Sequence, residues 1–450
     1  MNLDDLLKSV AERSAKYLAE IRDRQVFPNT AGLEALPALG GELPEEGQSA
    51  EDVLALLDEA GSPATVASTG ARYFGFVTGG TLHAALAANW LAGAWDQNAG
   101  LRVQSPVGTY LEEVCLAWLR EILKLPSGTG VGFVTGATMA NFTGLLAARH
   151  AVMERSGWDV ERNGLFGAPP ITVVVGDEVH ASLLRALSML GLGRDRVVRV
   201  PTDNQGRMIA SALPRIVSPA IVCIQAGNVN TGACDPAAEI CDVAHESNAW
   251  VHVDGAFGLW AAASPKRAHL VSGVDKADSW ATDCHKWLNV PQDSGLAFVR
   301  DAGTLETALQ FSAAYLATDN TREPMRFTPE MSRRARGVEV WAALRFLGKR
   351  GLAEMIERTC SHASTFASRL KSAGCTILND VVLNQVLVSF GSDERTKKII
   401  AAIQNEGTCW FGGTVWQGRA AMRISVSSWA TTGEDVEKSV AAILKIASEA

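Results

Sequence analysis

Two short motifs in the second half of the chain carry side chains suited to covalent chemistry. Lys286 follows the strand-like run 279–282 and stands between His285 and Trp287, so its amine is expected to be buried. Burial disfavours an ammonium ion and lowers its pKa, which makes a lysine a nucleophile toward carbonyl groups. Asp254 ends another apolar run upstream. If Lys286 were an ordinary surface lysine and Asp254 only a cap, two spaced motifs would have to coincide by chance.

The motifs His-Lys-Trp at 285–287 and Val-Asp-Gly-Ala at 253–256 resemble those of the group II decarboxylases, the family of the aromatic amino acid, glutamate and tyrosine decarboxylases. The resemblance covers nearly the whole chain and implies pyridoxal 5'-phosphate (PLP) as the cofactor. It implies that Lys286 holds PLP as a Schiff base while Asp254 pairs with the pyridine nitrogen. A carboxylate there keeps the nitrogen protonated, and the protonated ring stabilises a carbanion at the substrate's α-carbon.

Two helix starts provide further candidate contacts to the cofactor. A strand-like run passes into a helix through Gly136, Ala137 and Thr138, small residues that let backbone amides approach a phosphate at the positive end of the helix dipole. The resemblance identifies this turn as the phosphate cup, although Met139 replaces the glutamate of many relatives. His180, at the start of the next helix, corresponds to the histidine that stacks on PLP and helps to position the substrate carboxylate. Its alternative role is that of a plain helix cap.

The loop 225–232 follows another strand-like run, and its glycines and amides suit a tight turn over a ligand. Relatives place a Thr or Asn side chain from this loop near PLP. Asn230 is assigned this role here, although spacing alone does not separate it from Asn228 and Thr231.

The residues before the lysine depart from the family pattern, because most relatives have Asn where this chain has Asp283. An ionised aspartate would repel the cofactor's phosphate. We therefore assign the phosphate contact to Thr282 or to the backbone. His285 is expected to pack beside the phosphate end of the cofactor, as it does in relatives.

Two segments beyond Arg300 resemble further parts of the family's active site. Tyr315, in the loop-like run 312–321, fits the position of the tyrosine that protonates the α-carbon after carbon dioxide leaves. An ordinary loop tyrosine is the alternative. Ser332 opens the turn 332–337, which in relatives reaches the phosphate of the neighbouring subunit. The alternative is that its basic residues are simply solvated.

An aromatic L-amino acid is the preferred substrate class. Phe74 and Phe76 lie in the glycine-flanked aromatic segment 71–80, which resembles the substrate side of the family's site, and core packing is an equal alternative for them. Glutamate would need a basic distal anchor. Arg423, in the strand-like run 421–426, is expected to form a structural ion pair rather than to meet a substrate carboxylate.

These residues need a scaffold that brings distant loops together. Apolar runs alternate with helical segments, which predicts a mainly parallel sheet with ligands at the carboxyl ends of its strands. The runs are 131–134, 171–175, 196–200, 220–225, 249–253, 279–282 and 295–299. The resemblance implies an α/β fold: the seven-stranded PLP-dependent transferase fold type I of the aspartate aminotransferases, with a smaller C-terminal α+β domain. We expect an N-terminal helical arm at 1–60, a large PLP-binding domain at 61–320 and a small domain at 321–450.

Composition argues for a small-molecule partner. The chain has 450 residues, a net charge of −8 and no block of Lys and Arg, which disfavours nucleic acid or an anionic membrane as the main partner. We expect no signal peptide and no membrane span. Eight scattered cysteines without a Cys-x-x-Cys pair, and histidines without ligand spacing, predict reduced thiols in the cytoplasm and no metal site.

The N-terminal segment predicts a helix at 3–24 with one apolar stripe and little local core to cover it. In the family this arm lies across the partner subunit, so a homodimer is expected. Packing on its own chain is the alternative.

The resemblance implies PLP-dependent decarboxylation of an amino acid to a primary amine, with Lys286, Asp254, His180 and Tyr315 as catalytic residues. The alternatives are an aldehyde synthase, whose relatives usually have Phe at the position of Tyr315, an aminotransferase, and a PLP-binding protein without catalysis. A nicotinamide-binding fold is disfavoured, because no Gly-x-Gly-x-x-Gly follows a first strand.

Overall fold

A seven-stranded sheet forms the centre of the molecule, in the order β1-β7-β6-β5-β4-β2-β3. The structure is a computed structural model that describes residues 2–310 and 322–449. The strands are β1 Gly130–Val134, β2 Thr172–Gly176, β3 Val198–Val200, β4 Ala220–Gln225, β5 Trp250–Asp254, β6 Ser279–Asp283 and β7 Gly295–Val299. All seven predicted strands are confirmed to within two residues.

The sheet is mainly parallel, as predicted. Strands β3, β2, β4, β5 and β6 pair in parallel in that order. Strand β7 pairs antiparallel with both β6 and β1, so β1 runs in the same direction as the parallel strands. The connection 284–294, which carries Lys286, is too short for a crossover between parallel strands, and the chain therefore turns back as an antiparallel neighbour.

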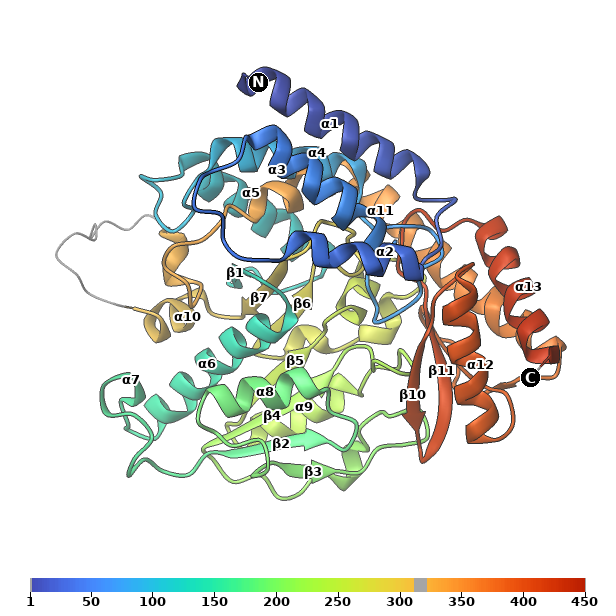
Figure 1. Cartoon of the computed structure of the whole chain (residues 1–450). Coiled ribbons are helices and arrows are strands. Elements are labelled where there is room, and N and C mark those ends of the chain that lie inside the picture. The colour runs from blue at the N-terminus through green and yellow to red at the C-terminus, as the bar shows by residue number, and fades with distance from the viewer. Residues whose placement is uncertain (1, 311–321, 450) are drawn as a thin grey trace.

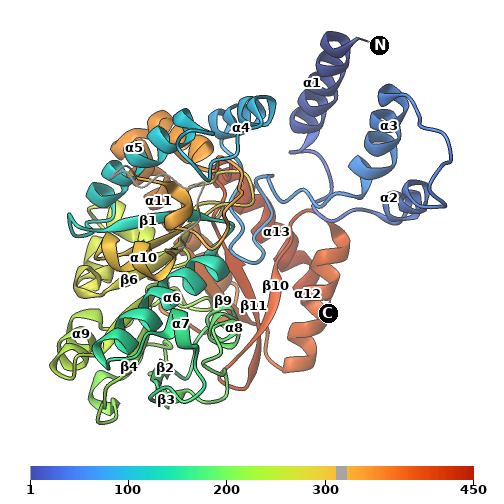
Figure 2. The ribbon, with the colours of Figure 1, turned by 90° about the vertical axis from the view of Figure 1, so that its left-hand side faces the viewer.

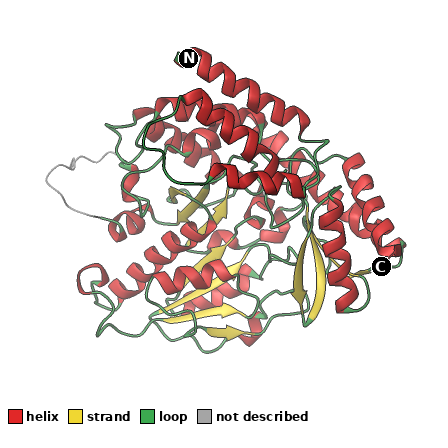
Figure 3. Cartoon of the chain, viewed as in Figure 1, coloured by secondary structure: helices red, strands yellow, loops and turns green. Residues whose placement is uncertain are grey.

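Both faces of this sheet are buried, which explains its continuous apolar strands. Along β4, Val222 and Ile224 belong to one hydrophobic cluster, whereas Ile221 and Cys223 belong to another on the opposite face. Helices lie around the sheet (Figures 1 and 3), and α6 packs on β5, β6 and β7. The helices of this part are α4 His83–Trp95, α5 Pro106–Ile122, α6 Ala137–Arg155, α7 Val160–Asn163, α8 Ala181–Met189, α9 Ala237–Glu246 and α10 Ala302–Ala308.

A second, four-stranded antiparallel sheet lies in the C-terminal part, as the expected smaller α+β domain requires. Its order is β10-β11-β9-β8. The strands are β8 Thr376–Ile377, β9 Gln385–Ser389, β10 Gly412–Trp416 and β11 Arg419–Ser425, and the helices are α11 Gly337–Ser372, α12 Asp393–Glu406 and α13 Gly433–Glu449. Helix α11 continues to Ser372 across a kink at Gly348, whose φ of 60° favours glycine.

Three helices at the N-terminus, α1 Leu3–Glu20, α2 Thr30–Ala35 and α3 Ala50–Leu56, extend from one side of the body (Figure 2). No residue of α1 is buried, and Leu3 and Leu7 are 70% and 59% exposed. Tyr17 and Leu18 line a cavity of about 450 Å³ together with residues of α3 and α4. The stripe of α1 is thus only partly covered by its own chain.

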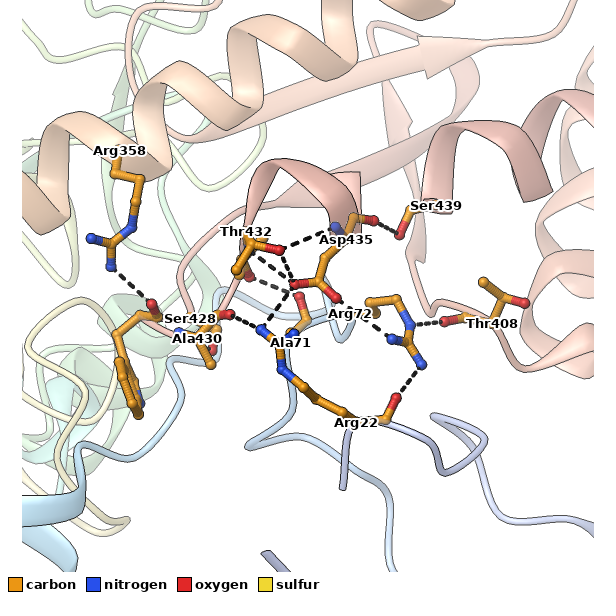
Figure 4. A network of polar contacts seen from close by, with 12 residues as sticks. Arg22, Ala71, Arg72, Arg358, Thr408, Ser428, Ala430, Thr432, Asp435 and Ser439 are labelled. Atoms are coloured by element: carbon orange, nitrogen blue, oxygen red, sulfur yellow. Dashed lines mark hydrogen bonds and ion pairs between the residues drawn. The ribbon is translucent and has the colours of Figure 1, made fainter. Parts of the chain in front are cut away.

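Arg72 ties the N-terminal segment to the C-terminal domain (Figure 4). Its guanidinium donates to the carbonyl oxygens of Thr408 and Arg22, at 2.7 and 2.6 Å, and lies 3.5 Å from the buried carboxylate of Asp435. Thr432 Oγ1 donates to the same carboxylate at 2.6 Å. These contacts fix the position of the start of the aromatic segment 71–80.

All eight cysteines are free and six of them are buried, which fits the prediction of mostly buried thiols. Within the described ranges, no helix is long and apolar enough to cross a membrane. The same residues contain no group of three or more His, Cys, Asp and Glu side chains placed to hold a metal ion.

Candidate active site

Four of the predicted site residues follow strands whose carboxyl ends point the same way. Gly136 follows β1, His180 follows β2, Asp254 ends β5 and Lys286 follows β6. Because these strands run in the same direction, their carboxyl ends meet at one edge of the sheet. The charges of Asp254 and Lys286 both act on the pKa of His180, so the tertiary structure brings these three residues together.

Lys286 pairs with the aspartate that departs from the family pattern. Its Nζ lies 2.9 Å from Asp283 Oδ2, and its side chain is 19% exposed. Asp283 Oδ1 accepts a hydrogen bond of 2.5 Å from the backbone N–H of Ala137, at the first turn of α6. A carboxylate is favourable there because the helix N-terminus carries partial positive charge. The spacing of three residues between Asp283 and Lys286 was the available sequence signal for this pair.

The assignment of Thr282 as a phosphate contact is not supported by its position. Its side chain is fully buried and its hydroxyl donates to the carbonyl oxygen of Ala256 at 3.4 Å, away from α6. Adjacent residues of a strand point to opposite faces, so Asp283, not Thr282, faces the start of α6. The backbone alternative stays open, because the amide of Thr138 also belongs to that first turn.

His285 lies beside the predicted phosphate cup. Its Nδ1 donates to the carbonyl oxygen of Ser294 at 2.9 Å, and its Nε2 lies 3.7 Å from Asp283 Oδ1. A Cβ at Gly136 would lie 3.2 Å from Asp283 Oδ1 and 3.3 Å from His285 Cε1. Glycine at this position therefore leaves room between the start of α6 and the residues around Lys286.

The aromatic segment approaches the lysine through its backbone. The N–H of Gly79 donates to the carbonyl oxygen of His285 at 3.3 Å. A Cβ at Gly79 would lie 1.8 Å from the carbonyl oxygen of Lys286. Only glycine permits this contact. The segment reaches it through Phe76 and Val77, which both adopt positive φ values, 53° and 55°. A β-branched residue in that conformation is strained, and such strain persists only where the surrounding structure enforces it.

Asp254 is a buried carboxylate that has no cationic partner among the residues the structure describes. It is 5% exposed, and its oxygens accept hydrogen bonds from Asn141 Nδ2 at 3.2 Å and from the N–H of Ala256 at 3.3 Å. No described Lys, Arg or His lies within ion-pair distance of it. An uncompensated buried charge is costly, so the environment of Asp254 fits a protonated ring nitrogen supplied by a bound cofactor.

His180 caps α8 and also faces the site. Its Nδ1 accepts from the N–H of Ser182 at 3.2 Å, which leaves the ring proton on Nε2 in the neutral form. The pKa of His180 is lowered, and burial is the main cause. The charge of Asp254 raises this pKa, whereas the charges of Lys286 and Arg423 lower it further. The imidazole is thus held neutral, and both of its predicted roles are compatible with its position.

Arg423 is not part of the structural ion pair that the sequence suggested. Its Nη1 lies 3.5 Å from Asn230 Oδ1, and no carboxylate of the described residues lies within ion-pair distance. Burial lowers the pKa of this guanidinium. A partly buried cation of this kind, close to His180, is suited to receive a carboxylate from a ligand.

In the loop 226–234, the three polar candidates for contact with the cofactor make different hydrogen bonds. Asn228 Oδ1 accepts from the N–H groups of Asn230 and Thr231, and so closes the turn. Thr231 Oγ1 donates to the carbonyl oxygen of Gln205 at 2.6 Å. Asn230 Oδ1 accepts from Thr414 Oγ1 at 3.1 Å and faces Arg423. Of the three, Asn230 therefore lies closest to the charged groups around His180.

Phe74 and Phe76 have different environments. For Phe74, the pocket wall and core packing were equal alternatives, and it is buried in the core of the C-terminal domain, 5.1 Å from Phe366 and 5.2 Å from Phe411 between ring centroids. Its backbone pairs with that domain, which directs its side chain inward. Phe76 is 62% exposed and lies 5.4 Å from the ring of Trp410. Only Phe76 remains available as a pocket wall.

The turn 332–337 uses its arginines within the chain. Arg333 forms a buried pair with Glu112 at 2.7 Å, and Arg336 pairs with Asp293 at 2.9 Å. Ser332 accepts from Asn98 Nδ2 at 3.2 Å and is exposed. Contact of Ser332 with a neighbouring subunit stays a prediction. Tyr315 lies outside the described residues, and its role also stays a prediction.

Comparison with known proteins agrees with this geometry. The family described as the pyridoxal-dependent decarboxylase conserved domain matches residues 35–391. Aromatic-L-amino-acid decarboxylase of Bacillus atrophaeus is 25% identical over 99% of this chain and 94% of its own length. L-2,4-diaminobutyrate decarboxylase of Rhizobium meliloti is 30% identical over 81% of this chain and 75% of its own.

Among solved structures, Oryza sativa TDC with PLP and tryptamine superimposes with a TM-score of 0.92. It is 23% identical, and the match covers 100% of this chain and 99% of that one. At this identity the likeness establishes the fold type that the sequence resemblance implied. The matched family and these relatives lead to one conclusion: the chain belongs to the pyridoxal-dependent decarboxylases, carboxy-lyases that act on amino acids with PLP as their cofactor.

Proposed function

We propose that this protein removes the carboxylate of an aromatic L-amino acid as carbon dioxide and releases the primary amine. The observation that carries the proposal is the buried Asp254 carboxylate, which pairs with no cation in the described ranges and lies at the same edge of the sheet as Lys286. When bound, PLP supplies a protonated ring that withdraws electrons from the α-carbon of the substrate. The other contributions come from side chains and backbone groups of the chain itself.

The cofactor would be held by groups at the carboxyl edge of the sheet. Lys286 provides the covalent attachment, Asp254 the partner of the ring nitrogen, and His180 a neutral ring at the face of the site. The backbone N–H groups at the start of α6 suit the phosphate, and His285 lies next to them. When the phosphate binds, the hydrogen bond from the N–H of Ala137 to Asp283 must break or be shared with the phosphate.

Arg423 and Asn230 would orient the substrate. The guanidinium of Arg423 has no carboxylate partner in the described part of the chain and lies near His180, so it suits the carboxylate of an amino acid. Holding that group in one orientation aligns the bond that breaks, and so lowers the entropic part of the barrier. Tyr315 would then donate a proton to the α-carbon.

The aromatic preference is supported by the surroundings of Phe76. Its exposed ring, held by a strained turn next to Trp410, offers an apolar wall in the same segment whose Gly79 backbone contacts Lys286. One relative acts on aromatic amino acids and another on 2,4-diaminobutyrate, whose amine would need an acidic partner. Carbon dioxide release from a panel of the twenty amino acids and 2,4-diaminobutyrate tests the preference. Turnover of only basic substrates contradicts it.

The products distinguish decarboxylation from its alternatives. An aldehyde synthase gives an aldehyde and hydrogen peroxide in place of the amine, and an aminotransferase moves the amino group to a keto acid. Mass analysis of the products of the best substrate separates the three reactions. Full cofactor occupancy without turnover of any amino acid would favour a PLP-binding protein without catalysis.

We also propose that the protein is a homodimer of the cytoplasm. The exposed leucines of α1 and the 93% exposed Leu43 leave apolar surface on the N-terminal arm. Six buried free thiols suit a reducing compartment. Light scattering at micromolar concentration is expected to give twice the chain mass of 47.9 kDa. An active monomer contradicts the proposal.

A further inference from the structure

Behind Asp254, four buried polar side chains from three elements form a single file. Trp250 Nε1 lies 2.8 Å from Ser279 Oγ, and Ser279 Oγ lies 2.8 Å from His252 Nδ1. His252 Nε2 lies 2.9 Å from Asn141 Oδ1, and Asn141 Nδ2 lies 3.2 Å from Asp254 Oδ2. Asn141, His252 and Ser279 are fully buried. Each link is of hydrogen-bond length, and the file ends on the carboxylate.

The direction of every hydrogen bond in this file is fixed by its two ends. Asn141 must direct its amide N–H to the Asp254 carboxylate, so its oxygen accepts and His252 Nε2 must carry a proton. At the other end, the indole of Trp250 can only donate, so Ser279 Oγ accepts a hydrogen bond from it and donates its own O–H to His252 Nδ1. Burial lowers the pKa of His252 to about 3, which agrees with a neutral ring that both donates and accepts.

All donors of the file therefore point toward Asp254. Hydrogen bonds to an ionised carboxylate stabilise its charged form, and a chain of bonds polarised in one direction strengthens the last one. The position of His252 is built into the packing of α6, since a Cβ at Gly144 would lie 2.8 Å from His252 Cε1. Asn141 was not among the site residues predicted from the sequence, although it lies about one turn beyond the phosphate cup on α6.

We propose that Asn141 and His252 are positioning residues that act through Asp254, by holding its carboxylate ionised and oriented toward the ring nitrogen of the cofactor. This inference rests on the proposed role of Asp254 as partner of that nitrogen. Without the donor from Asn141, the carboxylate becomes more basic and draws the shared proton away from the ring.

The test uses the holoenzyme loaded with PLP that is ¹⁵N-labelled in its ring, in the absence of substrate. The ¹⁵N chemical shift reports whether the proton resides on the ring nitrogen. In Asn141→Leu and His252→Leu, we expect the proton equilibrium to move about tenfold from the nitrogen toward Asp254. His252→Gln keeps an amide that donates to Asn141 Oδ1, and is expected to restore a signal close to that of the unmodified protein.

Ser279→Ala is the matched control. It deletes a hydroxyl at the far end of the file and leaves Trp250 Nε1 unpaired, so it is expected to lower the melting temperature while the ¹⁵N shift stays nearly unchanged. If the hydrogen-bond file had only a structural role, all variants would lose stability and none would change the ¹⁵N chemical shift. That result, or a shift in Ser279→Ala as large as in Asn141→Leu, overturns the inference.

The outcomes also separate this inference from the proposed function. If the unmodified protein binds no PLP or shows an unprotonated ring nitrogen, the proposed role of Asp254 itself fails. If the unmodified protein shows a protonated nitrogen and Asn141→Leu and His252→Leu show the same, only the positioning role of the two residues is wrong. His252→Gln keeps the test decisive even where a leucine variant does not fold.

Discussion

Asp283 joins Lys286 to the start of α6: its Oδ2 lies 2.9 Å from Lys286 Nζ, and its Oδ1 accepts from the N–H of Ala137 at 2.5 Å. The carboxylate thus occupies the helix N-terminus at which the cofactor's phosphate is expected to bind. Two anionic groups at one helix end repel each other, so cofactor binding and this contact are in competition.

Replacing Asp283 by Asn is therefore expected to tighten the binding of PLP about threefold to tenfold, because the amide is neutral and donates to phosphate. Titration of the cofactor-free protein, followed by absorbance, measures the dissociation constant. The control is Asp242→Asn, which removes an exposed surface partner of Lys276. Weaker binding in Asp283→Asn would mean that the charge of Asp283 helps to prepare Lys286 rather than to hinder the phosphate.

Lys286→Ala is expected to abolish the visible absorption band of the purified protein, because the covalent attachment of the cofactor is lost. In the unmodified protein, borohydride should remove the same band and leave the cofactor attached to the peptide that contains residue 286. Lys276→Ala serves as the control, since that lysine pairs with Asp242 at the surface. A band that persists in Lys286→Ala assigns the attachment to another residue.

Arg423→Gln is expected to raise the KM for the amino acid by about tenfold to a hundredfold, since a charged hydrogen bond to the substrate carboxylate is lost. The absorbance of the bound cofactor should change little. Arg419→Gln, an exposed arginine of the same strand, is the control. An unchanged KM in Arg423→Gln, with intact cofactor, contradicts the proposed contact.

His252 makes stability depend on pH in the acid range. Burial lowers its pKa in the folded protein from 6.5 to about 3, so between these values the unfolded chain binds a proton that the folded chain does not. The free energy of unfolding therefore falls as the pH falls from about 6.5 toward 3, by up to about 1.4 kcal/mol per pH unit. Urea unfolding at several pH values should show a shallower dependence in His252→Gln than in His83→Gln, which alters an exposed histidine. Equal slopes in the two variants exclude His252 as the source.

The contact between the N-terminal segment and the C-terminal domain depends on a buried pair. Asp435→Asn leaves the buried guanidinium of Arg72 without its carboxylate, and is expected to cost about 3 kcal/mol of the free energy of unfolding. The control is Glu437→Gln, which changes a residue on the same helix as Asp435, α13, and removes the partner of Arg369. That pair is exposed, so its loss should cost less than about 1 kcal/mol. Similar losses in the two variants would show that burial does not decide the value of these pairs.

The sequence by itself determined the strands and the residues that follow them. Apolar runs that end near Gly136, His180, Asp254 and Lys286 are local patterns, and the strands were confirmed to within two residues. In a mainly parallel sheet the carboxyl ends of the strands meet at one edge. A local pattern was therefore enough to predict that these four residues would come together.

Only the tertiary structure decided which neighbouring side chain faces the site. Thr282 and Asp283 are adjacent in β6, and successive strand residues point to opposite faces, so a choice between them requires the position of α6. Phe74 and Phe76 are two residues apart, but pairing of the backbone with the C-terminal domain buries one and exposes the other. The local sequence therefore does not show which residue of each pair faces the site.

The hydrogen-bond file behind Asp254 was also decided only by the fold. His252 and Asn141 are 111 positions apart, and their hydrogen bond depends on how closely α6 packs on β5 at Gly144. Likewise, Arg423 meets no carboxylate among the described residues, because the C-terminal sheet brings it against Asn230. Contacts across such separations depend on how the elements pack, and local periodicity carries no information about that packing.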